Sequence, residues 1–123
     1  MPTLTDIAGR VMKRLGLLDP DENPESKEAR DIIAIMESSH ASLLDRGLID
    51  WPFRGEGTGS INDPSLVPAR CEDAWINYAA WKCSADFGAT SQEVASRGQE
   101  GYRELIALSQ QPFDDRDIPV TDY

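Results

Sequence analysis

The chain has 123 residues, and its 22 Asp and Glu outnumber its 12 Lys and Arg, which gives a formal net charge of −10 at pH 7. This length predicts one domain with a modest core of its own and excludes a multidomain enzyme. The acidity argues against non-specific binding to DNA, RNA or anionic lipid, because those partners need positive protein surface.

No targeting or membrane segment is expected. The longest apolar runs, such as residues 32–36, are far shorter than a bilayer-spanning helix. Residues 1–17 alternate apolar side chains with Arg and Lys, unlike a signal peptide, so we expect a protein made in a cytoplasm. Cys71 and Cys83 would lie about 18 Å apart on one helix, so we expect both to stay reduced. One histidine and no CxxC spacing argue against a zinc site.

The first predicted helix runs from about Thr5 to Leu15, where apolar residues recur at three- and four-residue spacing. Thr3 or Thr5 is expected to cap its start, and Gly16 is expected to end it. Its apolar stripe consists of Leu4, Ile7, Ala8, Val11 and Leu15.

An acidic connector over residues 18–28 leads into the second predicted helix. Asn23 as N-cap and Pro24 in the first turn predict where this helix begins, and we expect it to run to Arg46. Gly47 is expected to end it. Its apolar stripe consists of Ala29, Ile32, Ile33, Met36, Leu43 and Leu44.

Residues 50–68 break the helical pattern. The glycines at 55, 57 and 59 and the prolines at 52 and 64 exclude a long helix here and predict a flexible loop or a short β-hairpin. The glycine run resembles a phosphate loop only in glycine content, because it lacks the lysine and no clear strand precedes it. So long an irregular connection in a small domain suggests a functional role.

The third predicted helix runs from Pro68 to Phe87 and is the candidate for the centre of the core, because it is the helix richest in aromatic residues and alanine. Gly88 is expected to end it. Its buried face is predicted to consist of Cys71, Ala74, Trp75, Tyr78, Ala79 and Lys82, widened by Trp81 and Ala85.

A capping box, Thr90-Ser91-Gln92-Glu93, predicts the start of a fourth helix. Gly98 and Gly101 each cost it about 1 kcal/mol relative to alanine, which predicts a close backbone approach to a neighbouring helix. Its stripe consists of Val94, Gly98, Tyr102, Leu105 and Leu108.

These elements predict an all-α fold, a small bundle of about four helices with a long loop or short β-hairpin between the second and third. Residues 1–109 would form the helical domain and residues 110–123 an extended C-terminal arm. In the arm, apolar side chains alternate with charge and proline, which fits either a disordered end or a segment that becomes ordered on a partner. The apolar members are Phe113, Ile118, Val120 and Tyr123.

No catalytic, cofactor-binding or metal-binding residues are predicted. His40, the only histidine, lies on the apolar stripe of the second helix, and its neighbouring serines do not make a triad, whose members converge from separate elements. We therefore expect a buried or interface histidine. A small hydrolase that uses His40 with a carboxylate is the enzymatic alternative. Cys71 and Cys83 are interpreted as small core residues.

A basic cluster lies on the first helix and has three possible roles. It can contact nucleic acid, form a solvated helix face, or complement the acidic connector, and the acidity of the chain favours the last two. The cluster consists of Arg10, Lys13 and Arg14.

The order and spacing of these elements resemble the head-to-tail adaptor proteins of tailed bacteriophages, also called head-completion or connector proteins, and especially the tail accessory factor of short-tailed phages. The resemblance covers residues 4–108 and contains no catalytic motif. The matching segments are AGRVMKRLGL (8–17), LLDRGLIDWPF (43–53), VPARCEDAWINYAAWKCSADFG (67–88) and TSQEVASRGQEGYRELIAL (90–108).

The resemblance implies a helical subunit without cofactors that assembles as a ring, usually dodecameric, under the portal protein in the virion. Such a ring extends the DNA channel, helps to retain packaged DNA without binding it specifically, and provides the attachment site for a tail or tail-hub protein. In this family the C-terminal segment commonly reaches the portal. Here that role falls on residues 110–123, with Phe113, Asp114, Asp115, Arg116, Ile118, Val120 and Tyr123.

Two further expectations complete the hypothesis. The loop is predicted to face the channel, a neighbouring subunit or the tail through Arg54, Glu56, Thr58 and Ile61. The alternative to an adaptor is an acidic module that binds and regulates another protein, as an inhibitor or DNA mimic.

Overall fold

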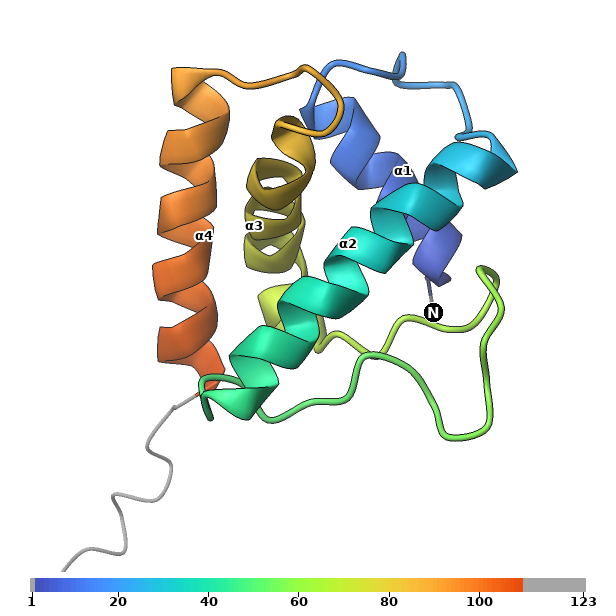
Figure 1. Cartoon of the computed structure of the whole chain (residues 1–123). Coiled ribbons are helices and arrows are strands. Elements are labelled where there is room, and N and C mark those ends of the chain that lie inside the picture. The colour runs from blue at the N-terminus through green and yellow to red at the C-terminus, as the bar shows by residue number, and fades with distance from the viewer. Residues whose placement is uncertain (1, 110–123) are drawn as a thin grey trace, which may run out of the picture.

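The computed structural model describes residues 2–109, and these residues form a helical bundle (Figure 1). Its elements are α1 (Leu4–Arg14), α2 (Ser26–Asp45), the short 3₁₀ turn η1 (Ala69–Cys71), α3 (Glu72–Ser84) and α4 (Gln92–Ser109). No β-strand occurs within residues 2–109, so the predicted all-α class and the four helices are confirmed. None of these helices is long and apolar enough to cross a membrane. The predictions made for residues 110–123 lie outside the described residues.

Helix α3 lies in the middle of the bundle and packs against α1, α2 and α4. Figure 1 shows α4 alongside α3 at one edge of the molecule, with α2 crossing in front. Side chains at 74–76 and again at 78–80 are buried, so α3 is covered nearly all round rather than along one stripe. The prediction that this helix forms the centre of the core is confirmed, but Lys82 and Ala85, assigned to its buried face, are exposed.

Two glycines let α4 approach α3 closely. A Cβ added at Gly98 would lie 2.2 Å from the Cβ of Trp81, and one added at Gly101 would lie 2.6 Å from the carbonyl oxygen of Ala74. Both distances are too short for non-bonded atoms, so neither position has room for a side chain. The close approach predicted from these glycines is confirmed.

The first helix begins with a capping box. The Thr3 hydroxyl accepts a hydrogen bond from the Asp6 backbone N–H (3.1 Å), and the Asp6 carboxylate accepts one from the Thr3 N–H (3.0 Å). Of the two threonines proposed as the cap, Thr3 is therefore the one used. Gly16 follows the helix with a φ of +76°, a left-handed conformation that glycine adopts without strain.

The start of α2 differs from the prediction. The helix begins at Ser26 with Glu25 as N-cap and no side-chain cap, whereas Asn23 and Pro24 were expected to begin it. Pro24 instead packs against α1, where its Cδ would lie 3.2 Å from a Cβ added at Gly9. Pro24 therefore packs against α1 instead of forming the first turn of α2, which the local pattern predicted.

The end of α2 agrees with the prediction except at one residue. Gly47 has a φ of +72°, and the Leu48 N–H donates to the Leu43 carbonyl (3.0 Å), which is the expected glycine cap. Leu44, however, is 44% exposed rather than on the buried stripe.

The last two helices begin later than predicted, and α3 also ends three residues earlier. Residues 69–71 form a 3₁₀ turn, and α3 itself spans Glu72–Ser84 rather than residues 68–87. At α4, the Ser91 hydroxyl accepts from the Val94 N–H (3.1 Å), so Ser91 caps the helix in place of Thr90. Glu93 pairs with Arg97 one turn on (2.8 Å) instead of closing a capping box.

Replacing Gly101 by alanine tests the α3–α4 approach. Although alanine is the better helix former, its Cβ would collide with the α3 backbone, and we expect a net loss of about 1–3 kcal/mol in the free energy of unfolding. Urea unfolding measures this change. Ser96→Ala, at an exposed position of the same helix, is the control and should change stability by less than about 0.5 kcal/mol. A Gly101→Ala protein as stable as the wild type would contradict the packing described here.

Candidate functional site

The connection over residues 50–68 is an irregular loop that is attached to the start of α1. The Leu4 N–H donates to the Asp63 carbonyl (2.9 Å), and the Thr5 N–H donates to the Ile61 carbonyl (3.1 Å). The Thr5 hydroxyl donates to the same Ile61 carbonyl (2.7 Å). Thr3 and Pro64 form an isolated antiparallel bridge, and within the described residues no hairpin forms in this loop. Of the two predicted forms, the loop is therefore the one observed.

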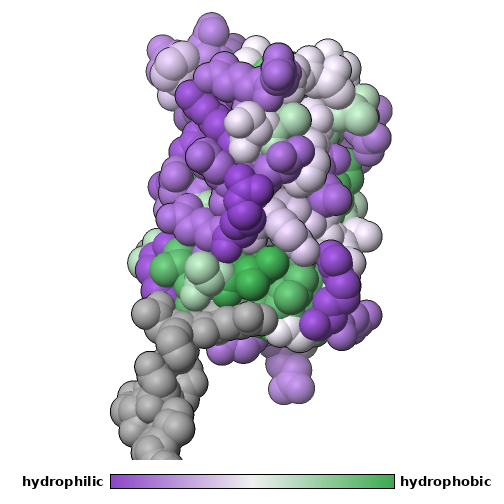
Figure 2. Space-filling model, turned by 90° about the vertical axis from the view of Figure 1, so that its left-hand side faces the viewer, coloured by the Kyte–Doolittle hydropathy of each residue, from purple (hydrophilic) through white to green (hydrophobic). Residues whose placement is uncertain are grey.

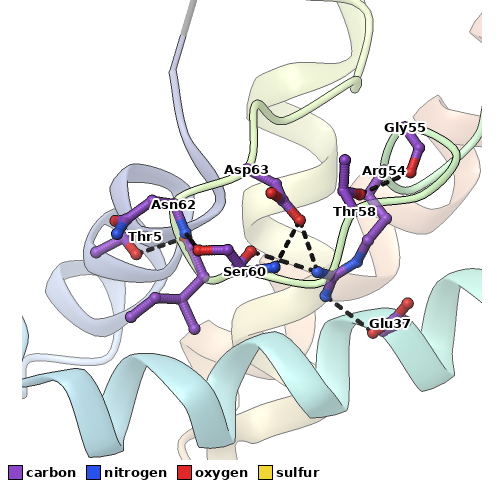
Figure 3. Close-up of polar contacts among 9 residues, drawn as sticks. Thr5, Glu37, Arg54, Gly55, Thr58, Ser60, Asn62 and Asp63 are labelled. Atoms are coloured by element: carbon purple, nitrogen blue, oxygen red, sulfur yellow. Dashed lines mark hydrogen bonds and ion pairs between the residues drawn. The ribbon is translucent and has the colours of Figure 1, made fainter.

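Arg54 connects the two arms of this loop and joins them to α2 (Figure 3). Its guanidinium donates to the Asp63 carboxylate (2.9 Å), to the Ser60 carbonyl (3.3 Å) and to the Glu37 carboxylate (3.1 Å). The Asp63 carboxylate also accepts from the Ser60 N–H (2.9 Å). Because the side chains of Arg54 and Asp63 are only 16% and 11% exposed, this pair is shielded from water and fixes the shape of the loop.

The four loop residues predicted to contact a partner lie in two different settings. Arg54 is mostly covered and is occupied by the ion pairs above, and Ile61 is half-buried. Glu56 and Thr58 are exposed at the tip of the loop, where the Thr58 hydroxyl donates to the Gly55 carbonyl (2.6 Å). The tip thus offers Glu56 and Thr58 to solvent, while the mostly covered Arg54 holds the two arms of the loop together.

A groove of about 560 Å³ separates this loop from α2. Arg30 and Glu37 line it from the helix, and Arg54, Ser60 and Ile61 line it from the loop. Both signs of charge occur along it, and the Glu37 carboxylate is already paired with Arg54. The groove therefore offers a mixed polar surface rather than a pocket for one charged ligand.

His40 is buried in an aromatic cluster. Its Nε2 lies 2.7 Å from the Trp51 carbonyl oxygen, and its ring packs on Trp51, Phe53 and Trp75 at centroid distances of 4.9, 5.6 and 6.3 Å. A carbonyl only accepts, so Nε2 carries the proton. Burial lowers the pKa of His40 below its usual 6.5, although the bond to Trp51 and the charge of Glu37 oppose this. The expected buried histidine is confirmed.

Both cysteines are buried and free. Burial raises the pKa of the Cys71 thiol, and it raises that of Cys83 to about 12. A thiol is a weak nucleophile until it ionises, so neither group is activated for attack. Their predicted place in the core is confirmed. Within residues 2–109, no cluster of His, Cys, Asp and Glu side chains could hold a metal ion.

Two members of the basic cluster on α1 are paired with α3. Arg10 forms an ion pair with Glu72, and Arg14 bonds to Asp73 (2.7 Å) and to the Asn77 side chain. These carboxylates lie in the first turn of α3, where negative charge also suits the helix dipole. The cluster therefore complements the start of α3 rather than the acidic connector that sequence reasoning considered.

Sequence reasoning missed a second surface, which we call the Lys82 groove. It is a hollow of about 170 Å³ between the end of α2, α3 and α4, and it combines two cations with three aromatic rings. The available signal was the spacing of aromatic residues and lysine along α3, which was assigned to the core. The Lys82 groove consists of Arg46, Tyr78, Trp81, Lys82 and Tyr102.

Comparison with protein-family models gives no match, and no curated protein matches the sequence.

Replacing Asp63 by alanine tests the ion pairs of the loop. The Arg54 guanidinium and the Ser60 N–H would lose a shielded acceptor, and we expect the free energy of unfolding to fall by about 1–3 kcal/mol. Glu37→Ala removes the half-exposed partner of the same guanidinium and should cost less than about 1 kcal/mol. Chemical unfolding measures both. Equal losses in the two variants would contradict the central position given to Asp63.

The buried state of His40 predicts a pH dependence of stability. Since its pKa is lower in the folded chain than in the unfolded chain, the unfolded chain binds more protons below about pH 6.5. The free energy of unfolding should therefore fall as the pH decreases from about 7.5 to about 5.5. His40→Gln removes the titrating group, so its slope over this range should be smaller than that of the wild type. Identical slopes would show that His40 does not titrate differently on folding.

Proposed function

We propose that this chain is a structural head-to-tail adaptor of a tailed bacteriophage, which docks on the portal ring of the DNA-filled head and has no catalytic role. The observation that carries the proposal is the order of elements in the segments that resemble this family. Along this chain the order is a short basic helix, an acidic connector, a long helix that ends in a glycine cap, an irregular loop and two packed helices.

The adaptor is proposed to act as a ring of copies, dodecameric by analogy with the family. Closed rings form when one face of a subunit fits a different face of the next, and repeated contacts of modest strength then add up. The ring extends the portal channel and carries a tail or tail-hub protein below. The exposed loop tip, with Glu56 and Thr58, is the part proposed to reach the channel, a neighbouring copy or the tail.

Charge supports a channel that passes DNA without gripping it. The chain carries a net charge of −10, and Arg10 and Arg14, the most basic cluster, are paired with carboxylates of α3. Phosphate binding requires free cations, so an acidic wall leaves the packaged DNA able to slide. In this proposal the protein is made in the host cytoplasm and ends at the portal vertex of the virion.

The C-terminal arm is proposed as the segment that binds the portal. Its apolar residues are spaced by charge and proline, and it follows directly on α4, whose last residue is Ser109. An extended segment of this kind can add buried area in every subunit of a ring.

A mixing experiment with the portal protein of the same genome tests the proposal. Native mass spectrometry and electron microscopy should show a stoichiometric ring of this chain added to the portal. Phe113→Ala with Ile118→Ala should weaken the addition, because both remove apolar contacts of the arm. Leu17→Ala, an exposed apolar position on the helical body, is the control and should bind like the wild type.

Two results would count against this function. A portal that stays bare would overturn the adaptor, and an acidic inhibitor or DNA mimic would then be the better hypothesis. Its basis is the acidic connector, in which Asp19, Asp21, Glu22 and Glu25 are all exposed. Full portal binding by the arm variants would keep the adaptor but remove the arm from its interface.

A further inference from the structure

The Lys82 groove is a surface for which the adaptor role supplies no use. Its two cations, Arg46 and Lys82, take part in none of the ion pairs of residues 2–109. Arg46 makes one long bond, from Nε to the Ser42 carbonyl (3.4 Å). These two cations share one hollow with no carboxylate among its lining residues, which favours a negatively charged ligand.

The floor of the groove is aromatic. Tyr78 and Tyr102 stack at a centroid distance of 5.6 Å, and the Lys82 ammonium lies 5.3 Å from the Trp81 ring centre and 5.5 Å from that of Tyr78. Trp81 and Tyr102 are only half-buried. Rings beside a cation suit a ligand that joins an apolar or aromatic group to a carboxylate.

The charge along this side of the molecule changes sign. Another hollow, of about 310 Å³, is lined by α2 residues and by Asp86 and Phe87, which follow Lys82 by four and five residues, with Asp31 as a second carboxylate. Acidic ligands are therefore repelled from the end near Asp86 and attracted to the end near Arg46. The attractive end of this surface, at Arg46, therefore lies at the C-terminal end of α2.

We propose that residues 113–117 of the same chain dock in the Lys82 groove. This segment reads Phe-Asp-Asp-Arg-Asp and so offers one aromatic ring and three carboxylates against one guanidinium. Phe113 supplies the ring for the aromatic floor, and Asp114 and Asp115 supply the charge for Arg46 and Lys82.

The length of chain beyond α4 permits this docking. Tyr102 lies seven residues before Ser109, about 10 Å along the helix at 1.5 Å per residue. The four residues from 110 to 113 can span at most about 13 Å, so Phe113 can come to the level of Tyr102 only if they run back along α4 in extended form. So short a tether gives an effective concentration in the millimolar range, which favours the chain's own segment over a separate acidic peptide.

Apolar surface lies toward the lower end of the α4 face of the molecule, where α4 ends (Figure 2). Leu44, at the end of α2, is 44% exposed, and Ile106 and Leu108, near the end of α4, are half-buried. A segment that turns back from Ser109 would cover such surface on its way to the groove.

A spin label on the arm of the full chain tests the docking. Thr121→Cys places the label, since Cys71 and Cys83 are buried with raised pKa values and should not react. We expect the amide signals of Lys82 and Tyr102 to lose most of their intensity through paramagnetic broadening. Arg46→Glu with Lys82→Glu should restore the Tyr102 signal. Lys13→Glu with Lys27→Glu, the same charge change at exposed positions elsewhere, should leave the broadening intact.

A charge swap tests whether misfolding explains the loss of broadening in the Arg46→Glu, Lys82→Glu protein. Adding Asp114→Lys and Asp115→Lys to the Arg46→Glu, Lys82→Glu protein should bring the broadening of Tyr102 back. Broadening that is the same in the wild type and in the Arg46→Glu, Lys82→Glu protein would overturn the proposal. The proposal would also be overturned if broadening appeared only when an isotope-labelled copy without a spin label is mixed with a separate spin-labelled copy. The arm in the groove would then belong to a second chain. No portal is present, so the result is independent of the adaptor hypothesis.

Discussion

The close packing of α4 on α3 is the constraint on which the rest of the structure depends. Gly98 and Gly101 leave no room for a side chain, so the two helices lie against each other through backbone and through Trp81 and Ala74. With α4 on one side and α1 and α2 on others, α3 is buried nearly all round. The buried side chains of α1 and α2 pack around this central helix in one hydrophobic core. The outer face of α4 and the groove beside it are what this packing leaves for solvent.

The proposed function uses two segments, the loop between α2 and α3 and the C-terminal arm. The loop between α2 and α3 is held by the mostly buried pair of Arg54 and Asp63 and by backbone bonds to α1, and its tip presents Glu56 and Thr58 to solvent. The C-terminal arm follows α4 in the sequence, and Tyr102 of α4 lines a cationic and aromatic groove. If the arm rests in that groove in the free chain, its acidic residues would have to leave Arg46 and Lys82 before the arm could bind a portal. Portal binding would then be sensitive to Arg46 and Lys82 as well as to the arm itself.

Local chemistry was readable from the sequence, and long-range contacts were not. The cap at Thr3, one of the two threonines proposed, and the glycine that ends α2 at position 47 depend on local backbone chemistry and agree with the prediction. The glycines of α4 are the exception, because their local cost to the helix indicated a contact with another helix. Asn23 and Pro24 failed as a helix start because Pro24 packs on Gly9 of another helix. Lys82 was assigned to the core because helical spacing places it beside Tyr78, yet its amine reaches solvent over the aromatic rings. The loop was identified from its glycines, but Glu37, Arg54 and Asp63 lie too far apart in sequence for their ion pairs to be foreseen.

The central claim is that this chain is a structural component of the portal vertex. Electron cryomicroscopy of particles produced from the genome that encodes it tests this claim directly. We expect a symmetric ring of small helical subunits under the portal, into which the four helices and the loop of residues 50–68 fit. Particles that lack the chain, or a portal that joins the tail with no such ring between them, would show that the chain is not an adaptor.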